Sequence, residues 1–134
     1  MRKIILLLLV LIPFVTFSQV KQNEKYYQTE FAKVINGTTE VYLPDRTRVD
    51  IMTESHVFEV DFATKWAESI GQSLHYEGMT GKQAAVLLVM KGTSEERFLK
   101  RLMQVASKHG IEVWVWNYLD DTYKKVEYKL EYEY

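Results

Sequence analysis

Three closely spaced carboxylates are the residues of this chain best suited to chemistry. Asp50 lies in the string Arg-Val-Asp, and Glu59 and Asp61 lie in the string Glu-Val-Asp-Phe. Both strings alternate apolar and polar side chains, which predicts two β-strands, and the polar residues Glu54 and Ser55 between them predict a hairpin turn. If the hairpin is symmetric about this turn, the numbers of paired residues sum to 109, and Asp50 then faces Glu59.

The same register places Arg48 opposite Asp61 and puts the four charged side chains on one face of the hairpin. The alternate positions are apolar and are expected to face the core: Val49, Ile51, Phe58, Val60 and Phe62. Two carboxylates opposite each other repel by roughly 3 to 4 kcal/mol at an effective dielectric constant of about 20. Either Arg48 and Lys65 neutralise them in a structural ion-pair cluster, or a divalent cation such as Mg²⁺ binds between Asp50 and Glu59.

The helix predicted after the hairpin adds polar groups beside the carboxylates. Lys65, Gln72 and Tyr76 are spaced by seven and four residues, which places them on one helical face. Phosphodiester hydrolysis uses a cation with a lysine beside it, because the metal activates water while the ammonium stabilises the developing charge. The spacing therefore favours a hydrolytic site over a solvated surface.

The hydrophobic pattern predicts the elements that must position these residues. Helices are expected over residues 24–35, 65–76 and 93–109. Strands are expected over residues 39–43, 48–53, 57–63, 84–90, 112–118 and 126–134. Thr93 and Glu96 have the spacing of a capping box, and the alternation in 126–134 is typical of an amphipathic edge strand. This order predicts an α/β fold, a mixed sheet flanked by helices.

Composition limits the class of protein further. The chain has 134 residues, no cysteine and a formal net charge of -1, which indicates one globular domain without disulfides or thiolate zinc sites. Such a charge argues against a generic basic surface for nucleic acid but leaves room for a local one. The third helix has a basic side that is either solvated or a phosphate contact, and it comprises Lys91, Arg97, Lys100, Arg101 and Lys108.

The first eighteen residues have the layout of a secretory signal peptide. Arg2 and Lys3 precede a run of nine apolar residues, Ile4 to Ile12, which is too short for a membrane span. Cleavage after Ser18 would leave residues 19–134 as a single domain. It would lower the basic count from 17 to 15 against 18 acidic residues, giving a net charge of -3. We therefore expect a periplasmic or secreted protein, outside the membrane once the signal is cleaved.

Asp50, then Glu59 with Asp61, then Gln72-Ser-Leu-His-Tyr76 resemble the PD-(D/E)XK nuclease superfamily. The resemblance is to its small nuclease-like members, which carry the strings seen here at residues 48–50, 59–62 and 65–74, and it spans about residues 23–115. It implies a restriction-endonuclease-like αβββαβ core, here with an added helix and C-terminal strands.

The resemblance also implies roles for individual residues. Asp50 and Glu59 would hold Mg²⁺ or Mn²⁺, with the Val60 carbonyl as a further ligand. Gln72 and Tyr76 would match the Q-x-x-x-Y element of the RecB-type branch.

Two acidic positions and one lysine complete this set. Glu30 would match an acidic residue that some members place on the first helix, and it would then be a further metal ligand. The family's catalytic lysine normally lies two residues after the acidic ligand, where this chain has Asp61. Some members carry the lysine on the following helix, and Lys65 is placed to be such a residue. Without such a lysine, Asp61 would add a third negative charge to the site, which would mean either a richer metal site or an inactive descendant.

Together these observations predict an exported, metal-dependent nuclease-like protein that hydrolyses phosphodiester bonds of nucleic acid. The competing interpretation is a catalytically inactive exported protein that keeps the fold for binding or for a structural purpose. Export favours this second class, because most members known to act on DNA work inside the cell. The sequence does not indicate an oligomeric state.

Overall fold

A computed structural model describes residues 22–128 of the chain. The helices of this range are α1 (Glu24–Ile35), α2 (Trp66–Thr80) and α3 (Glu96–His109), with 3₁₀ turns η1 (Ala63–Lys65) and η2 (Thr93–Glu95). The strands are β1 (Thr38–Tyr42), β2 (Arg48–Met52), β3 (His56–Phe62), β4 (Gln83–Met90), β5 (Glu112–Asn117) and β6 (Thr122–Lys125). The predicted order of helices and strands is confirmed. The predicted signal peptide, residues 1–18, lies outside the described residues.

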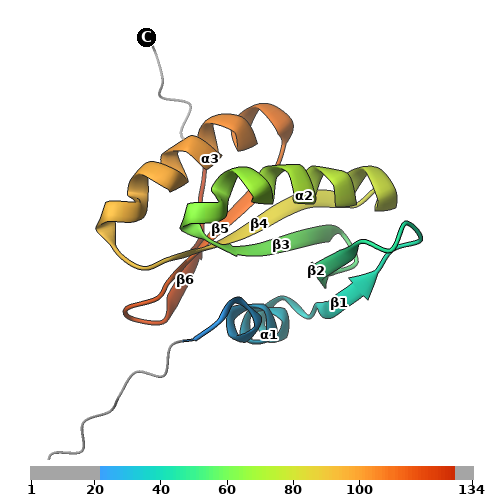
Figure 1. The fold of residues 1–134 in the computed structure, drawn as a ribbon, viewed down its shortest axis with the longest axis horizontal. Helices are drawn as coiled ribbons and strands as arrows, with labels where there is room; N and C mark the ends of the chain where they lie inside the picture. The colour runs from blue at the N-terminus through green and yellow to red at the C-terminus, as the bar shows by residue number, and fades with distance from the viewer. Residues whose placement is uncertain (1–21, 129–134) are drawn as a thin grey trace, which may run out of the picture.

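The strands form one mixed sheet with the order β1-β2-β3-β4-β5-β6. β3, β4 and β5 are parallel to one another, whereas β1, β2 and β6 join antiparallel. The helices α2 and α3 connect the parallel strands and cover one face, and α1 covers the other (Figure 1). The protein is thus an α/β fold with a sheet between two helical layers, as predicted.

Each face of the sheet carries its own hydrophobic core. On the α1 face, Tyr27 and Phe31 pack against Phe58, Leu87 and Trp116. On the opposite face, buried residues of β4 and β5 pack beneath α2 and α3: Ala84, Val86, Leu88, Leu102, Ala106, Ile111 and Val113. β4 contributes to both cores, which confirms that residues 84–90 form a strand buried on both faces.

Helix α1 begins and ends where its sequence predicts. The Asn23 side chain accepts a hydrogen bond from the Tyr26 amide at 3.1 Å, and Asn36 ends the helix in the left-handed conformation. A Cβ atom at Gly37 would overlap the Ile51 side chain, so only glycine permits this close approach of the loop to β2. These caps fix the angle at which α1 crosses the sheet.

The hairpin register is confirmed, but the ladder between β2 and β3 is shorter than predicted. Its pairs are Ile51 with Phe58 and Met52 with Val57, and both sum to 109. At Asp50 the alternation of β2 changes, because Val49 packs with Val57 on the α2 face instead of sharing the α1 face with Ile51. The predicted facing of Val49 is therefore wrong.

Arg48 does not lie opposite Asp61 either. It pairs with Tyr42 of β1, and its guanidinium lies 3.7 Å from the Glu40 carboxylate. The ladder between β2 and β3 ends at Ile51, so no register pair brings Arg48 to Asp61.

The predicted structural ion-pair cluster of Arg48 and Lys65 with the carboxylates is formed in part. The Lys65 ammonium lies 3.8 Å from the Asp61 carboxylate. Arg48 pairs with Glu40, but its charge still opposes the rise that burial causes in the pKa of Asp50.

The predicted capping box at α3 is also absent. The chain enters α3 through the 3₁₀ turn η2, and in this part of the chain no side chain caps the start of either element. The Glu95 carboxylate instead accepts a hydrogen bond from the Lys91 backbone amide at 2.7 Å. Thr93 and Glu96 are left without the reciprocal bonds that their spacing predicts.

The last described strand, β6, does not overlap the C-terminal strand predicted over residues 126–134. β6 starts at Thr122 and pairs antiparallel with β5, with Tyr123 opposite Trp116. Residues 126–128 lie outside any strand, and residues 129–134 lie outside the described range. β6 is nevertheless an edge strand, the position expected for the C-terminal strand.

Candidate functional site

Three carboxylates gather between β2, β3 and α2. Glu59 and Asp61 lie on alternate positions of β3, point toward α2 and are only 5% and 4% exposed. Asp50 approaches them from β2. Burying a carboxylate in an apolar environment costs free energy unless a nearby cation or hydrogen-bond donor compensates its charge. The groups around the three carboxylates therefore decide what this cluster does.

Asp50 is held by the backbone of β3. Its carboxylate accepts a hydrogen bond from the Val60 amide at 2.9 Å, which uses the donor that a longer ladder would have engaged. Its own carbonyl accepts a hydrogen bond from the Gln28 amide group of α1 at 2.7 Å. Burial raises the pKa of Asp50, and the Val60 amide and the Arg48 charge oppose this rise. Asp50 is thus fixed in position from both faces of the sheet.

Glu59 has the most perturbed environment of the three. Burial, together with the charges of Asp50 and Asp61, raises its pKa to about 9, although an interaction with the Tyr76 hydroxyl lowers it. Its Oε2 atom is buried and has no hydrogen-bond partner within the described residues. Unsatisfied buried oxygens are rare, so this atom calls for a partner that the described residues do not supply: a proton on the carboxyl group, a water molecule or a bound ion.

Asp61 is already satisfied by the chain. Its carboxylate accepts a hydrogen bond from the Ser69 hydroxyl at 2.8 Å and lies 3.8 Å from the Lys65 ammonium. Burial raises its pKa to about 6, while Ser69 and Lys65 lower it. The Lys65 ammonium donates to the Glu24 carboxylate at 2.8 Å, and this bond raises the pKa of Lys65. Asp61 and Glu24 thus hold the lysine between α1 and α2.

The α2 residues predicted to share one face do lie over β3. Tyr76 is buried beside Glu59, and burial and the Glu59 charge raise its pKa. Gln72 is exposed and interacts with the Tyr76 hydroxyl, and Lys65 lies at the start of the same row. The structure therefore places Asp50 and Tyr76 beside Glu59, with Gln72 next to Tyr76, whereas Lys65 lies beside Asp61 and Glu24.

Glu30 is not part of this cluster. Its carboxylate accepts a hydrogen bond from Lys33 at 2.6 Å on the surface of α1, and its charge acts on Tyr26 rather than on the three carboxylates. The acidic residue of α1 that reaches the cluster is Glu24, because Glu24, Gln28 and Phe31 share the helix face that meets the sheet.

Sequence reasoning missed Glu24 and Ser69. Ser69 had a local signal, since it lies four residues after Lys65 and seven before Tyr76, on the same helical row. Glu24 had none, because its role depends on how α1 crosses the sheet.

The four-residue ligand set predicted from the sequence is not assembled. Among residues 22–128, no three His, Cys, Asp or Glu side chains form a group that could hold a metal ion. Asp61 is engaged by Ser69 and Lys65, and Glu30 lies elsewhere. Asp50 and Glu59 still fit a hard cation, because Mg²⁺ is often bound by one or two carboxylates, with water and substrate phosphate completing its shell. The buried Oε2 of Glu59 is the oxygen that such an ion would satisfy.

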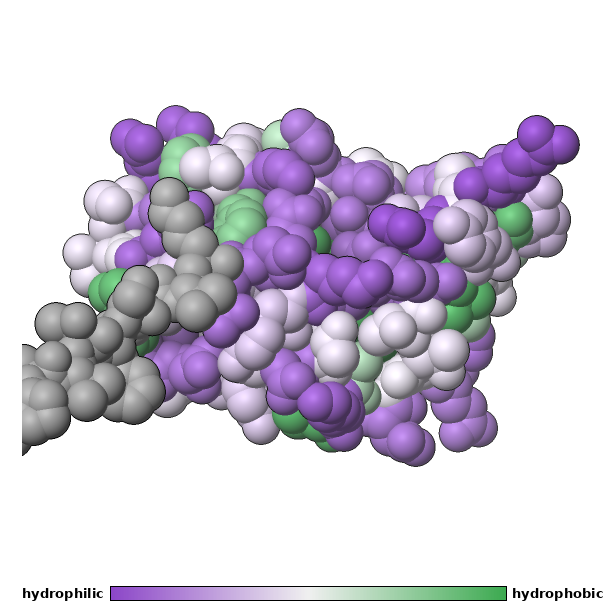
Figure 2. Space-filling view, turned by 60° about the horizontal axis from the view of Figure 1, so that its bottom comes forward, coloured by the Kyte–Doolittle hydropathy of each residue, from purple (hydrophilic) through white to green (hydrophobic). Residues whose placement is uncertain are grey.

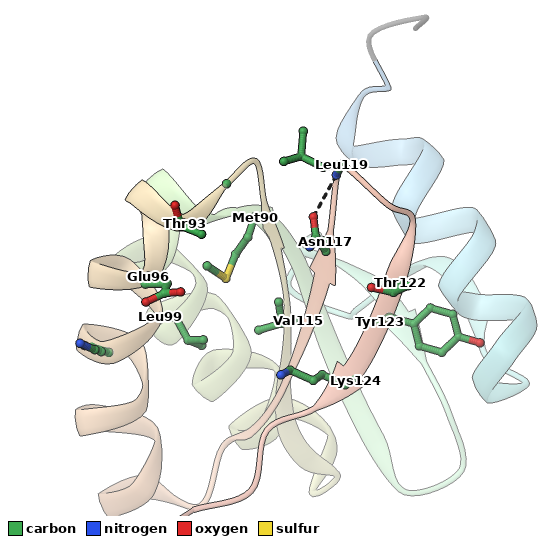
Figure 3. Close-up of a pocket in the computed structure, with 12 residues that line it drawn as sticks. Met90, Thr93, Glu96, Leu99, Val115, Asn117, Leu119, Thr122, Tyr123 and Lys124 are labelled. Atoms are coloured by element: carbon green, nitrogen blue, oxygen red, sulfur yellow. Dashed lines mark hydrogen bonds between the residues drawn. The ribbon is translucent and has the colours of Figure 1, made fainter.

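A separate cavity of about 510 Å³ lies between α3 and the β5–β6 hairpin (Figure 3). Met90, Leu99 and Val115 contribute apolar side chains to it, and Lys100 and Lys124 add cations. It contains none of the clustered carboxylates, so it is not the centre of the candidate chemistry. The face that carries α1 is mainly hydrophilic, with hydrophobic residues in small separate groups (Figure 2).

Comparisons with known proteins leave this geometry as the main evidence. No protein-family model matches the chain, and neither a curated protein nor a solved structure matches it. Within residues 22–128, no helix has the length and apolar character needed to cross a membrane.

Proposed function

We propose that this protein is an exported nuclease that depends on a divalent cation, with Asp50 and Glu59 as the cation ligands. The observation that carries this proposal is the buried, unpartnered Oε2 atom of Glu59, next to a second carboxylate that the β3 backbone fixes in place. A proton on Glu59 would satisfy this oxygen, and a divalent cation would satisfy it while offsetting the charges of both carboxylates. The order of these residues along the chain supports a relationship to the PD-(D/E)XK superfamily.

The chain's own residues divide the work of the reaction. Asp50 is rigid because the Val60 amide and Gln28 hold it on both sides. Tyr76 orients Glu59 from α2, and Gln72 acts on Tyr76 in turn. When bound, Mg²⁺ or Mn²⁺ would supply an activated water and polarise the phosphoryl oxygen.

Lys65 is the residue that we assign to the charge of the reacting phosphate. Its side chain is 46% exposed while that of Asp61 beside it is buried, so Lys65 lies at the solvent side of the cluster. Asp61 and Glu24 position this ammonium, and Ser69 positions Asp61. An ammonium held in advance stabilises developing phosphate charge without reorganisation during the reaction.

Thermal unfolding with and without cation tests the ligand assignment. Mg²⁺ or Mn²⁺ at a hundred times its Kd should stabilise the protein by about 2.7 kcal/mol, and Asp50→Asn should abolish this effect. Glu30→Gln is the matched control, because it removes a carboxylate outside the cluster. If neither cation raises the melting temperature, or if Asp50→Asn responds like the parent protein, the assignment is wrong.

A cleavage assay on DNA and RNA tests the chemistry itself. Lys65→Ala should lower the rate at least tenfold, equivalent to about 1.4 kcal/mol of transition-state stabilisation. A smaller loss would remove Lys65 from the catalytic residues. If the protein binds the cation but cleaves neither nucleic acid, the inactive descendant becomes the better interpretation.

A further inference from the structure

Three cations near the ends of β3 and β4 lie over aromatic rings, Lys91 over a ring that packs on the α1 face, and Arg97 and Arg101 over rings that pack on the α2–α3 face. The Lys91 ammonium is 4.3 Å from the centre of the Phe62 ring. The Arg97 guanidinium carbon is 4.7 Å from the centre of the Phe98 ring, and that of Arg101 is 5.9 Å from the same centre. Such contacts attract a cation to the ring without neutralising its charge.

These three cations form no ion pair within the described residues. The side chains that pair with carboxylates there are Lys25, Lys33, Arg48, His56, Lys65, His75 and Lys125. Glu95 lies near Lys91 in sequence, but its carboxylate accepts from the Lys91 backbone amide instead of the ammonium. Lys91, Arg97 and Arg101 therefore keep their charge available for an external anion.

The aromatic rings connect these cations to the candidate site. Phe62 directly follows Asp61 in the chain, and Trp66, whose ring centre is 6.0 Å from the Arg101 guanidinium, directly follows Lys65. Figure 1 shows that α2 and α3 begin at the same end of the sheet, where β3 and β4 end. The cations thus lie at the end of the sheet that carries Asp61 and Lys65, Lys91 on the α1 face and Arg97 and Arg101 on the α2–α3 face.

We propose that Lys91, Arg97 and Arg101 form a basic rim that holds the phosphate backbone of a polynucleotide beside the reacting bond. This inference rests on the proposed function and specifies its substrate: a chain with several phosphates on one side of the scissile one. The rim binds without reading sequence, because cations already cover the Phe62 and Phe98 rings, on which bases would otherwise stack. A local rim is needed since the chain as a whole is slightly acidic.

Binding of labelled DNA to Asp50→Asn protein, in which cleavage is disabled, tests the rim. The probes are two fluorescent 20-residue oligonucleotides of unrelated sequence, measured by anisotropy over a series of salt concentrations. Adding Arg97→Ala or Arg101→Ala should weaken binding at least threefold and reduce the slope of log affinity against log salt by about one, equally for both probes. Lys108→Ala, on the last turn of the same helix, is the matched control and should change neither quantity.

Three results would overturn the rim: no binding of either probe to the Asp50→Asn protein, equal loss in the Lys108→Ala control, or loss confined to one probe sequence. Arg97→Lys should retain most of the binding, which separates a charge effect from damage to helix packing. The rim and the metal site fail separately, because the cation-dependent melting shift does not depend on Arg97 or Arg101. If Arg97→Ala and Arg101→Ala leave the affinity for DNA and its salt dependence unchanged while Mg²⁺ or Mn²⁺ still raises the melting temperature, the rim is wrong and the proposed function stands.

Discussion

The chemistry of the site depends on how each carboxylate is satisfied. Asp50 receives a backbone amide, Asp61 receives a hydroxyl and lies beside an ammonium, and Glu59 keeps a buried oxygen without a partner. Similar side chains on adjacent strands therefore differ in role. Asp50 and Asp61 are each held by a hydrogen-bond donor of the chain, whereas Glu59 has the strongest tendency to take up a proton or a cation.

The pH dependence of stability should reveal Glu59. Its pKa is about 9 in the folded protein against 4.5 in the unfolded chain, so between these values the folded state keeps a proton that the unfolded state has lost. Without metal, stability should fall as pH rises from about 5 to about 9, by about 3 kcal/mol at pH 7. Urea unfolding in chelator should show this slope in the parent protein and in Glu30→Gln but not in Glu59→Gln. An unchanged slope in Glu59→Gln would show that another group is responsible.

At the scale of elements, what could be predicted was local. The caps of α1, the register of the hairpin and the continuous apolar run of β4 follow from neighbouring residues, and the structure agrees. The failures involve distant contacts. Nothing near Asp50 in sequence shows that its carboxylate takes the Val60 amide, and nothing near Glu24 shows that α1 brings it to Lys65. Glu30 is predicted for the site in place of Glu24, because the crossing angle of α1, which brings Glu24 to Lys65, has no local signal in the sequence.

Gly37 tests how tightly α1 and β2 are joined. A Cβ at this position would overlap the Ile51 side chain, so Gly37→Ala should destabilise the protein by about 1 to 3 kcal/mol. Gly78→Ala is the opposite control, because Gly78 lies inside α2 with open space around it, and alanine there should stabilise by about 0.5 to 1 kcal/mol. Chemical denaturation of both variants measures the difference. Equal effects would mean that the loop yields to the added methyl group.

For the molecule as a whole, the distribution of charge matters more than its sum. Asp61, Lys65 and the basic rim lie at the end of the sheet where α2 and α3 begin, whereas Glu59 lies beside Tyr76, farther along α2. A polynucleotide bound to the rim would thus meet carboxylates that repel its phosphates until a divalent cation binds. Binding and cleavage should therefore respond to salt and to divalent cations in different ways.

Export is the prediction that concerns the whole chain. If residues 1–18 are a signal peptide, expression of the full sequence in a bacterial host should yield a product in the periplasm or medium that begins at Gln19. Mass spectrometry of the intact product measures this directly. Accumulation of the full-length chain in the cytoplasm would contradict the assignment, whereas replacing Leu8 by Arg should block processing because it interrupts the apolar run.

The backbone of Glu40 has a consequence for how this protein behaves in concentrated surroundings. Glu40 has a φ of 55° in the middle of β1, which is an edge strand of the sheet. A left-handed residue there breaks the straight row of amides and carbonyls that another chain would need for pairing. The opposite edge, β6, is only four residues long and ends in Lys124 and Lys125. Both borders of the sheet therefore discourage the growth of intermolecular β-structure.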